Sequence, residues 1–300
     1  MDERFCKVGD VELCYETFGD RGDPAMLLIM GLGTQMIAWP EEFCRMLAQK
    51  GFFVIRYDNR DVGRSTRFDG APTPKQWEML RRKPKRVAYG LADMAGDGVG
   101  LLDELGIQSA HVVGASMGGM IGQVLAARHP ERVLSFTSIM STTGSRWRGR
   151  PALRALPKLL ARPKEGKEAY VERLVRLFRV VGSPGFERDE DALRRLAGQA
   201  YDRGVSNAGL ARQLAAINAS GHRKEDLRGI KAPTLVIHGT KDRLVKRSGG
   251  KATAKAIPEA RLMMIEGMGH DLPPGAWPRI VEGIVKNAAR AREAAHSRAA

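Results

Sequence analysis

The stretch from Ser109 to Arg128 constrains the fold more than any other part of the sequence. It opens with a short apolar run typical of a buried strand, passes through Gly114-Ala115-Ser116-Met117-Gly118, and then takes on helical spacing. A strand, a tight turn around a serine and a helix form a nucleophile elbow, in which the hydroxyl projects from the turn and the helix N-terminus faces the reacting group. This stretch therefore predicts a sheet with Ser116 at one of its edges.

Strands and helices alternate on both sides of this elbow. The first two strands read as an antiparallel hairpin, and the later alternation of strand and helix favours parallel pairing. We therefore predict an α/β fold with a mostly parallel eight-stranded sheet and helices on both faces. Besides the elbow, the expected strands are Arg4–Val8, Val11–Phe18, Ala25–Met30, Phe52–Tyr57, Val133–Ser138, Thr234–Gly239 and Arg261–Ile265, and the expected helices are Trp39–Gln49, Leu91–Leu105, Ser248–Ile257 and Trp277–Ala294.

The alternation stops between Pro151 and Gly221, where only helical patterns occur. We interpret this segment as a helical cap laid over the carboxyl edge of the sheet. The predicted domains are a first part of the core over residues 1–144, the cap over 145–231 and a second part of the core over 232–300. The expected cap helices are Ala152–Ala161, Lys167–Val181, Asp189–Tyr201 and Ala208–Ser220.

The net charge of +15 is concentrated in the predicted cap. Residues 144–231 hold 20 Lys and Arg but 10 Asp and Glu. Such a balance leaves nucleic acids or anionic surfaces open as partners. However, the basic residues alternate with Leu, Val and Ala at helical spacing, with few aromatic residues between them, so we interpret them as a solvated helix face and do not expect nucleic acid as a partner.

The remaining composition indicates an ordinary globular protein. The sequence lacks a signal-length apolar run after Met1 and any run of about 18 apolar residues, so we expect a cytosolic protein without a membrane span. Cys6, Cys14 and Cys44 are odd in number and lack metal-ligand spacing. The hairpin register sets Cys6 opposite Leu13 and turns Cys14 to the other face, which argues against a Cys6–Cys14 disulfide. Monomer and homodimer both stay open.

A serine hydroxyl needs a base within hydrogen-bonding reach, and six histidines are candidates. His270 lies in a glycine-flanked loop directly after the last predicted strand, at the sheet edge where Ser116 also emerges. His238 ends another strand and is expected to brace the neighbouring loop instead. We therefore predict that His270 is the base.

The base needs an acid that holds it in the correct tautomer. Asp242 follows the strand Thr234–Gly239, whereas the loop after Val133–Ser138 carries no carboxylate. Asp271 adjoins the base in sequence and is expected to point away from it. The chain order Ser116, Asp242, His270 is the order found in hydrolases with this kind of elbow.

Ester chemistry also needs donors for the developing oxyanion, and backbone amides serve best because they are already fixed. We predict the amides of Met117, next to the nucleophile, and Leu32, in the loop after the strand Ala25–Met30. Met36, Met140 and Trp147, together with the side chains of Leu32 and Met117, are candidates for an apolar substrate pocket, with core packing as the alternative.

These motifs resemble those of the α/β-hydrolase superfamily over nearly the whole chain: Gly31-Leu32-Gly33, the polar loop Asp58–Ser65, Gly114–Gly118, His238–Asp242 and Gly269-His270. We expect the polar loop to act as a hydrogen-bonded brace. Met30-Gly31 with Trp39-Pro40, Ile55–Asp58 and Gly267–His270 are similar to the branch that contains aclacinomycin methylesterase and related bacterial carboxylesterases. The resemblance implies a serine esterase with no cofactor and no metal. Met30 stands where many relatives have His, and the basic cap also departs from the family.

The sequence thus predicts a serine hydrolase that cleaves a small-molecule carboxylic ester through an acyl-enzyme on Ser116. Alternatives on the same fold are lactone or carbon–carbon bond hydrolysis and perhydrolase or haloperoxidase-like activity, which share the triad. A ligand-binding receptor without catalysis is the alternative from another class, although the intact triad argues against it.

Overall fold

The computed structural model describes residues 2–75, 78, 84–145, 147–149 and 165–299. Its centre is an eight-stranded sheet in the order β1-β2-β4-β3-β5-β6-β7-β8. Pairing is parallel from β4 to β8 and antiparallel for β1 with β2 and for β2 with β4, which confirms the mostly parallel sheet. The strands are β1 (Arg4–Val8), β2 (Val11–Phe18), β3 (Ala25–Ile29), β4 (Phe53–Tyr57), β5 (Ala110–Ala115), β6 (Val133–Ile139), β7 (Thr234–Gly239) and β8 (Arg261–Ile265).

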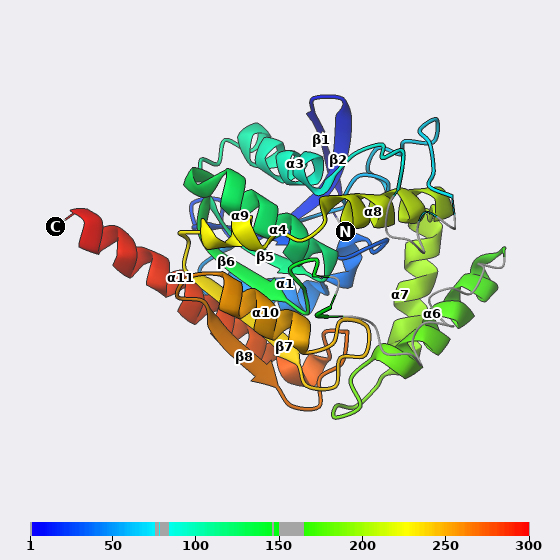
Figure 1. Cartoon of the computed structure of the whole chain (residues 1–300). Helices are drawn as coiled ribbons and strands as arrows, with labels where there is room; N and C mark the ends of the chain where they lie inside the picture. The colour runs from blue at the N-terminus through cyan, green and yellow to red at the C-terminus, as the bar shows by residue number, and fades with distance from the viewer. Residues whose placement is uncertain (1, 76–77, 79–83, 146, 150–164, 300) are drawn as a thin grey trace.

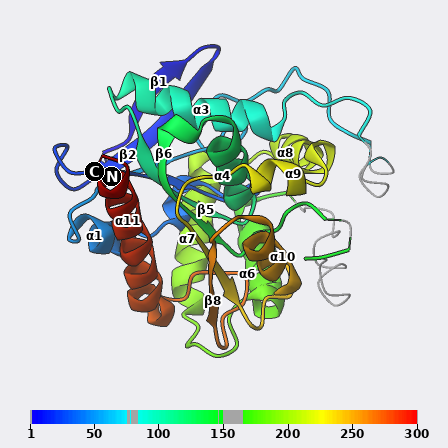
Figure 2. The ribbon, with the colours of Figure 1, turned by 60° about the vertical axis from the view of Figure 1, so that its left-hand side comes forward.

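Helices cover both faces of the sheet, because the central strands are apolar on both sides. Every residue of β3, β4, β5 and β7 is buried. One apolar cluster joins the sheet to α3 (Leu91–Glu104), α4 (Met117–Arg128), α9 (Lys224–Arg228) and α10 (Ser248–Ala256). A second cluster joins the other face to α1 (Glu41–Ala48) and α11 (Trp277–Ala299), which lie side by side in Figure 2.

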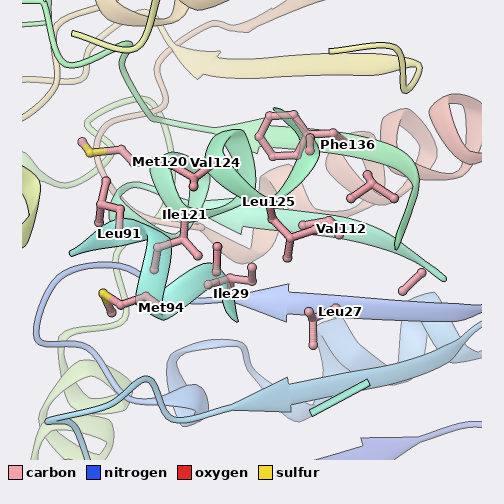
Figure 3. Close-up of a cluster of buried hydrophobic side chains, with 14 of the residues drawn as sticks. Leu27, Ile29, Leu91, Met94, Val112, Met120, Ile121, Val124, Leu125 and Phe136 are labelled. Carbon is pink, nitrogen blue, oxygen red and sulfur yellow. The ribbon is translucent and has the colours of Figure 1, made fainter. Parts of the chain in front are cut away.

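The first cluster holds the helix that follows the elbow. Figure 3 shows side chains of α3 and α4 packed over β3 and β5, with Phe136 of β6 beside them. Helix α4 is buried along almost its whole length, so its apolar residues form no single stripe. Burial of each large apolar side chain contributes roughly 1.5–3 kcal/mol. This packing fixes the start of α4 relative to the ends of β3 and β5.

The structure corrects the expected bounds of α1 and α11. Helix α1 begins at Glu41 rather than Trp39. Pro40 is the N-cap with ψ 147°, and Trp39 lies outside the helix because the residue before a proline avoids the helical region. A short 3-10 helix, Met36–Ala38, precedes α1. Helix α11 runs beyond Ala294 to Ala299. The expected helix Ala152–Ala161 lies outside the described residues.

Between β6 and β7, the described residues hold three helices ahead of α9: α6 (Lys167–Val181), α7 (Glu190–Arg203) and α8 (Asn207–Ser220). Figure 1 shows α6 and α7 packed side by side. The side chains of Asp189 and Ser206 cap the N-termini of α7 and α8. We call these three elements the inserted helices.

Buried ion pairs fasten the inserted helices to the polar loop after β4. Arg203 Nη2 lies 2.8 Å from Asp58 Oδ2, and the Arg212 guanidinium makes two contacts of 2.7 Å with the carboxylate of Asp61. Breaking such a pair by removing one partner typically costs about 3–5 kcal/mol. The polar loop is thus the hydrogen-bonded brace that the sequence predicts.

The interpretation of all basic residues in residues 144–231 as a solvated face is wrong for three arginines. Arg203, Arg212 and Arg223 are 8%, 1% and 3% exposed, because their guanidinium groups reach acceptors of the core. Arg223 bonds only to neutral acceptors, the Thr142 and Gly221 carbonyls and the Gln123 side chain, among its described partners, and burial lowers its pKa to about 10. Helical spacing alone does not reveal which cations turn inward.

The cysteines and the hairpin register agree with the sequence prediction. Cys6 pairs with Leu13 across the hairpin, and all three cysteines are free thiols. Burial raises the pKa of Cys6 to about 11 and those of Cys14 and Cys44 to about 12. In the described parts of the chain, none of the helices combines the length and the apolar character needed to cross a membrane.

Candidate active site

The elbow forms where β5 ends and α4 begins. Ser116 separates the two elements with φ 54° and ψ −114°, a left-handed conformation that a non-glycine residue adopts only at a cost. The neighbouring positions must be glycine for steric reasons, because a Cβ on Gly114 would lie 2.2 Å from the Gly118 carbonyl oxygen. A Cβ on Gly118 would lie 2.0 Å from the carbonyl oxygen of Ile29. The predicted elbow is confirmed in its geometry.

We expect Gly118→Ala to lower the free energy of unfolding by about 3 kcal/mol or more, which is the upper end of the usual cost of overpacking. The cost is high because the atom that the new Cβ would meet belongs to the backbone and cannot move aside easily. Gly96→Ala is the matched control: Gly96 lies in the interior of α3, where an added Cβ meets nothing within 4 Å. This control should raise stability by roughly 0.5–1 kcal/mol. Urea unfolding followed by circular dichroism measures both, and equal stability of the two variants would contradict the close packing at the elbow.

Three side chains from three strand ends meet at the elbow. Ser116 follows β5, Asp242 follows β7 and His270 follows β8. His270 Nε2 lies 3.0 Å from Ser116 Oγ, and His270 Nδ1 lies 2.8 Å from Asp242 Oδ2. The His270 backbone is fixed from the inserted helices, since its N–H donates to the Val181 carbonyl at 2.7 Å. The structure therefore brings together the three residues that the sequence singles out.

The environment of Asp242 favours its ionised form. Its second oxygen, Oδ1, accepts hydrogen bonds from the backbone amides of Leu244 and Val245 at 2.9 and 2.8 Å. Burial alone raises the pKa of this carboxyl, but the neighbouring imidazoles of His270 and His238 outweigh it and hold the pKa at about 2. The carboxylate of Asp242 is therefore ionised at neutral pH.

His238 braces the loop that carries Asp242, as its position at the strand end predicts. Its Nε2 lies 2.7 Å from the Val245 carbonyl oxygen and 3.4 Å from Asp242 Oδ2. The ring is completely buried, and a Cβ on Gly250 of α10 would collide with it. Asp271, next to His270 in sequence, accepts a hydrogen bond from Ser183 Oγ.

The loop after β3 brings a second backbone segment to Ser116. A Cβ on Gly31 would lie 3.1 Å from Ser116 Cβ, and a turn closes where the Thr34 N–H donates to the Gly31 carbonyl at 3.2 Å. Leu32 occupies this turn. Met117 is the first residue of α4, so its amide has no partner within the helix. Both amides that the sequence predicts as oxyanion donors thus belong to segments that adjoin Ser116.

Side chains of the polar loop hold this turn at its two ends. Asn59 Nδ2 donates to the Met30 carbonyl at 3.0 Å, and the Met36 N–H donates to Asp58 Oδ1 at 2.7 Å. Sequence reasoning did not assign these supporting contacts to Asp58 and Asn59. In the sequence, the only sign of this supporting role is that Asp58 and Asn59 directly follow a strand that ends at the same edge of the sheet.

Three of the pocket candidates lie in different surroundings. Met36 is completely buried beside Cys14, Met140 is buried in the second apolar cluster, and Trp147 is 82% exposed. Their role in a substrate pocket stays a prediction. Among the residues that the structure describes, no three His, Cys, Asp or Glu side chains gather as a metal site would require.

Curated relatives are similar to this chain over almost their entire length. The chain is 33% identical over 298 residues to a rhodomycin D methylesterase from a Streptomyces strain, covering 91% of this chain and 93% of the relative. It is 32% identical to the rhodomycin D methylesterase of Streptomyces peucetius, with the same coverage. It is also 28% identical to a 3-oxoadipate enol-lactonase of Acinetobacter baylyi, over 92% of this chain and 94% of the relative.

Solved structures show the same fold. The enol-lactonase from Burkholderia xenovorans superposes with a TM-score of 0.74 at 27% identity, covering 95% of this chain and 99% of that one. The family model described as "alpha/beta hydrolase fold" matches residues 24–273, which includes Ser116, Asp242 and His270. With the elbow, the strand order and these matches in agreement, the chain belongs to the α/β-hydrolase family.

Proposed function

We propose that Ser116, His270 and Asp242 are the nucleophile, the base and the orienting acid of this carboxylic ester hydrolase. The observation that carries the proposal is the unbroken series of contacts from Asp242 Oδ2 through both ring nitrogens of His270 to Ser116 Oγ, at 2.8 and 3.0 Å. A base within this distance of a hydroxyl, itself held by a buried carboxylate, is what nucleophilic catalysis by serine requires.

The reaction proceeds in two halves. His270 Nε2 takes the proton of Ser116 Oγ as the oxygen attacks the ester carbonyl carbon, and the amides of Leu32 and Met117 stabilise the oxyanion. The imidazolium then protonates the departing alcohol, which leaves an acyl-enzyme. Water gives a proton to Nε2 and attacks the acyl carbon; collapse releases the carboxylic acid and returns the proton to Ser116. Asp242 stabilises the imidazolium in both halves.

A methyl ester of a small organic acid is the substrate class that the relatives favour, since two relatives above 30% identity are named as methylesterases. A lactone is a second candidate, favoured by the similarity to enol-lactonases. The same machinery opens a lactone, because the leaving alcohol is merely tethered to the acyl group. We further propose that residues 145–231 act as the specificity-determining cap, without a nucleic-acid partner. A cytosolic location and a monomer or homodimer also stay predictions.

Covalent labelling tests the proposal. A fluorophosphonate should modify the protein once, on Ser116, as located by peptide mass spectrometry, and should abolish hydrolysis in proportion to labelling. The unlabelled protein should hydrolyse short-to-medium p-nitrophenyl esters and aryl methyl esters, and a lactone in the same panel distinguishes the second candidate. Labelling elsewhere, or hydrolysis that survives complete labelling of Ser116, would refute the assignment.

A further inference from the structure

The side chain of Gln213 joins the turn after β3 to the polar loop after β4. Gln213 lies on α8 and is completely buried. Its Oε1 accepts from the Gly33 N–H at 2.8 Å, and its Nε2 donates to the Arg60 carbonyl at 2.8 Å. One side chain of the inserted helices therefore bonds two separate loops of the core, with 180 residues of chain between Gln213 and Gly33.

Both partners of Gln213 are themselves fixed. The Arg60 guanidinium contacts the buried carboxylate of Asp97 at 2.6 and 2.5 Å, which anchors the backbone that offers the carbonyl. Gly33 has φ 63°, and a Cβ there would lie 2.5 Å from Leu210 Cδ1 on α8. The left-handed conformation favours glycine at this position, and the Leu210 side chain of α8 lies against the turn.

The bond from Gln213 acts on the peptide unit that follows Leu32. The Gly33 N–H belongs to the peptide between Leu32 and Gly33, and the Leu32 N–H belongs to the peptide before it, so Leu32 is the hinge between the two. A buried N–H without an acceptor is costly, and a turn rotates its peptides to recover one. Loss of the Gln213 acceptor would therefore change the direction of the neighbouring Leu32 N–H.

We propose that Gln213 is a positioning residue for the oxyanion hole: by holding the Leu32–Gly33 peptide, it aims the Leu32 amide at the oxygen of the tetrahedral intermediate. The inference rests on the proposed function, because it assumes that Leu32 is an oxyanion donor. It gives α8 a part in the chemical step in addition to any part in covering the substrate.

Gln213→Met tests this role, because it keeps the length and volume of the side chain and removes both hydrogen bonds. We expect kcat for a p-nitrophenyl ester to fall by ~10-fold to ~10²-fold. This loss does not exceed the ~10²–10³-fold that deleting one oxyanion donor outright typically causes. KM should change less than ~3-fold, because the interaction is needed in the transition state. The inhibition constant of a trifluoromethyl ketone, which forms a tetrahedral adduct with the serine, should rise in parallel with the loss in kcat/KM.

Ser206→Ala is the matched control for a loss of α8 stability alone. Ser206 Oγ caps the same helix by accepting from the Gly209 N–H at 2.9 Å and contacts no residue of the turn among its described hydrogen bonds. It should lower Tm without changing the ketone inhibition constant or the kcat per active site, counted by fluorophosphonate titration. Gln213→Asn, which shortens the side chain by one methylene, serves as a second test variant that retains a polar group if the methionine does not fold.

The outcomes separate the inference from the proposed function. A wild-type protein without ester hydrolysis and without labelling of Ser116 would remove the proposed function and the inference with it. An active wild type whose folded Gln213 variants keep kcat within ~3-fold, or lose activity only through KM, would overturn the role of Gln213 alone. If Ser206→Ala and Gln213→Met raised the inhibition constant of the trifluoromethyl ketone equally, the role of Gln213 would also be overturned.

Discussion

Replacing Ser116 by alanine should reduce kcat/KM for a short-chain p-nitrophenyl ester by at least ~10³-fold. In the proposed mechanism the hydroxyl oxygen forms the acyl bond, and no other hydroxyl among the described contacts bonds to His270. The oxyanion amides and the binding surface persist in this variant, so a residual rate above that in water is expected. Steady-state kinetics on purified protein measures the loss.

The fold should survive this substitution, which makes the kinetic result interpretable. Alanine at φ 54° carries about the same backbone strain as serine, and the deleted group loses only its bond to His270. Ser141→Ala is the matched control. Ser141 Oγ donates to the Ser116 carbonyl at 2.7 Å, so this substitution removes a neighbouring hydroxyl and leaves Ser116 in place. Ser141→Ala should lower kcat/KM by less than ~10-fold. An Ser116→Ala variant with the wild-type rate would place the nucleophile elsewhere.

The sheet and the meeting of Ser116, Asp242 and His270 could be predicted because their signals are local. The apolar runs that became β3 and β5 are buried along their whole length, and the bounds of β1, β2 and β8 agree with the sequence. Carboxyl ends of parallel strands share one edge, so residues that directly follow strands meet even when they are far apart in sequence. That rule suffices to place Ser116, Asp242 and His270 together.

The contacts by which the inserted helices support the site could not be predicted, because they depend on how these helices dock. Arg203, Arg212 and Gln213 lie on polar positions of amphipathic helices, where the sequence favours solvent. Their partners, Asp58, Asp61 and Gly33, are 145 to 180 residues away, and a helical period does not reveal which polar face is buried. Only three-dimensional packing shows that these side chains bond the core.

A large loss is also expected from Asp242→Asn, about 10³–10⁴-fold in kcat. The loop itself dictates the orientation of the new amide. Two backbone N–H groups, of Leu244 and Val245, point at the position of Oδ1 and require an oxygen there. The amide NH₂ must then take the place of Oδ2, 2.8 Å from His270 Nδ1.

This orientation reverses the tautomer of the base. An NH₂ group donates, so Nδ1 must accept, and the ring proton moves to Nε2, which faces Ser116 Oγ. The imidazole then has no lone pair with which to take the serine proton. Nitrogen-15 NMR of the histidine ring should show the proton on Nδ1 in the wild type and on Nε2 in the variant.

Asp271→Asn is the matched control, because it removes a neighbouring carboxylate whose described side-chain hydrogen bond is with Ser183 Oγ. It should retain more than a tenth of the activity. Since the pKa of Asp242 is about 2, the carboxylate stays ionised across the assay range. An Asp242→Asn variant that keeps the Nδ1 proton and the wild-type kcat would show that the base is oriented without its carboxylate, which contradicts the assignment of Asp242.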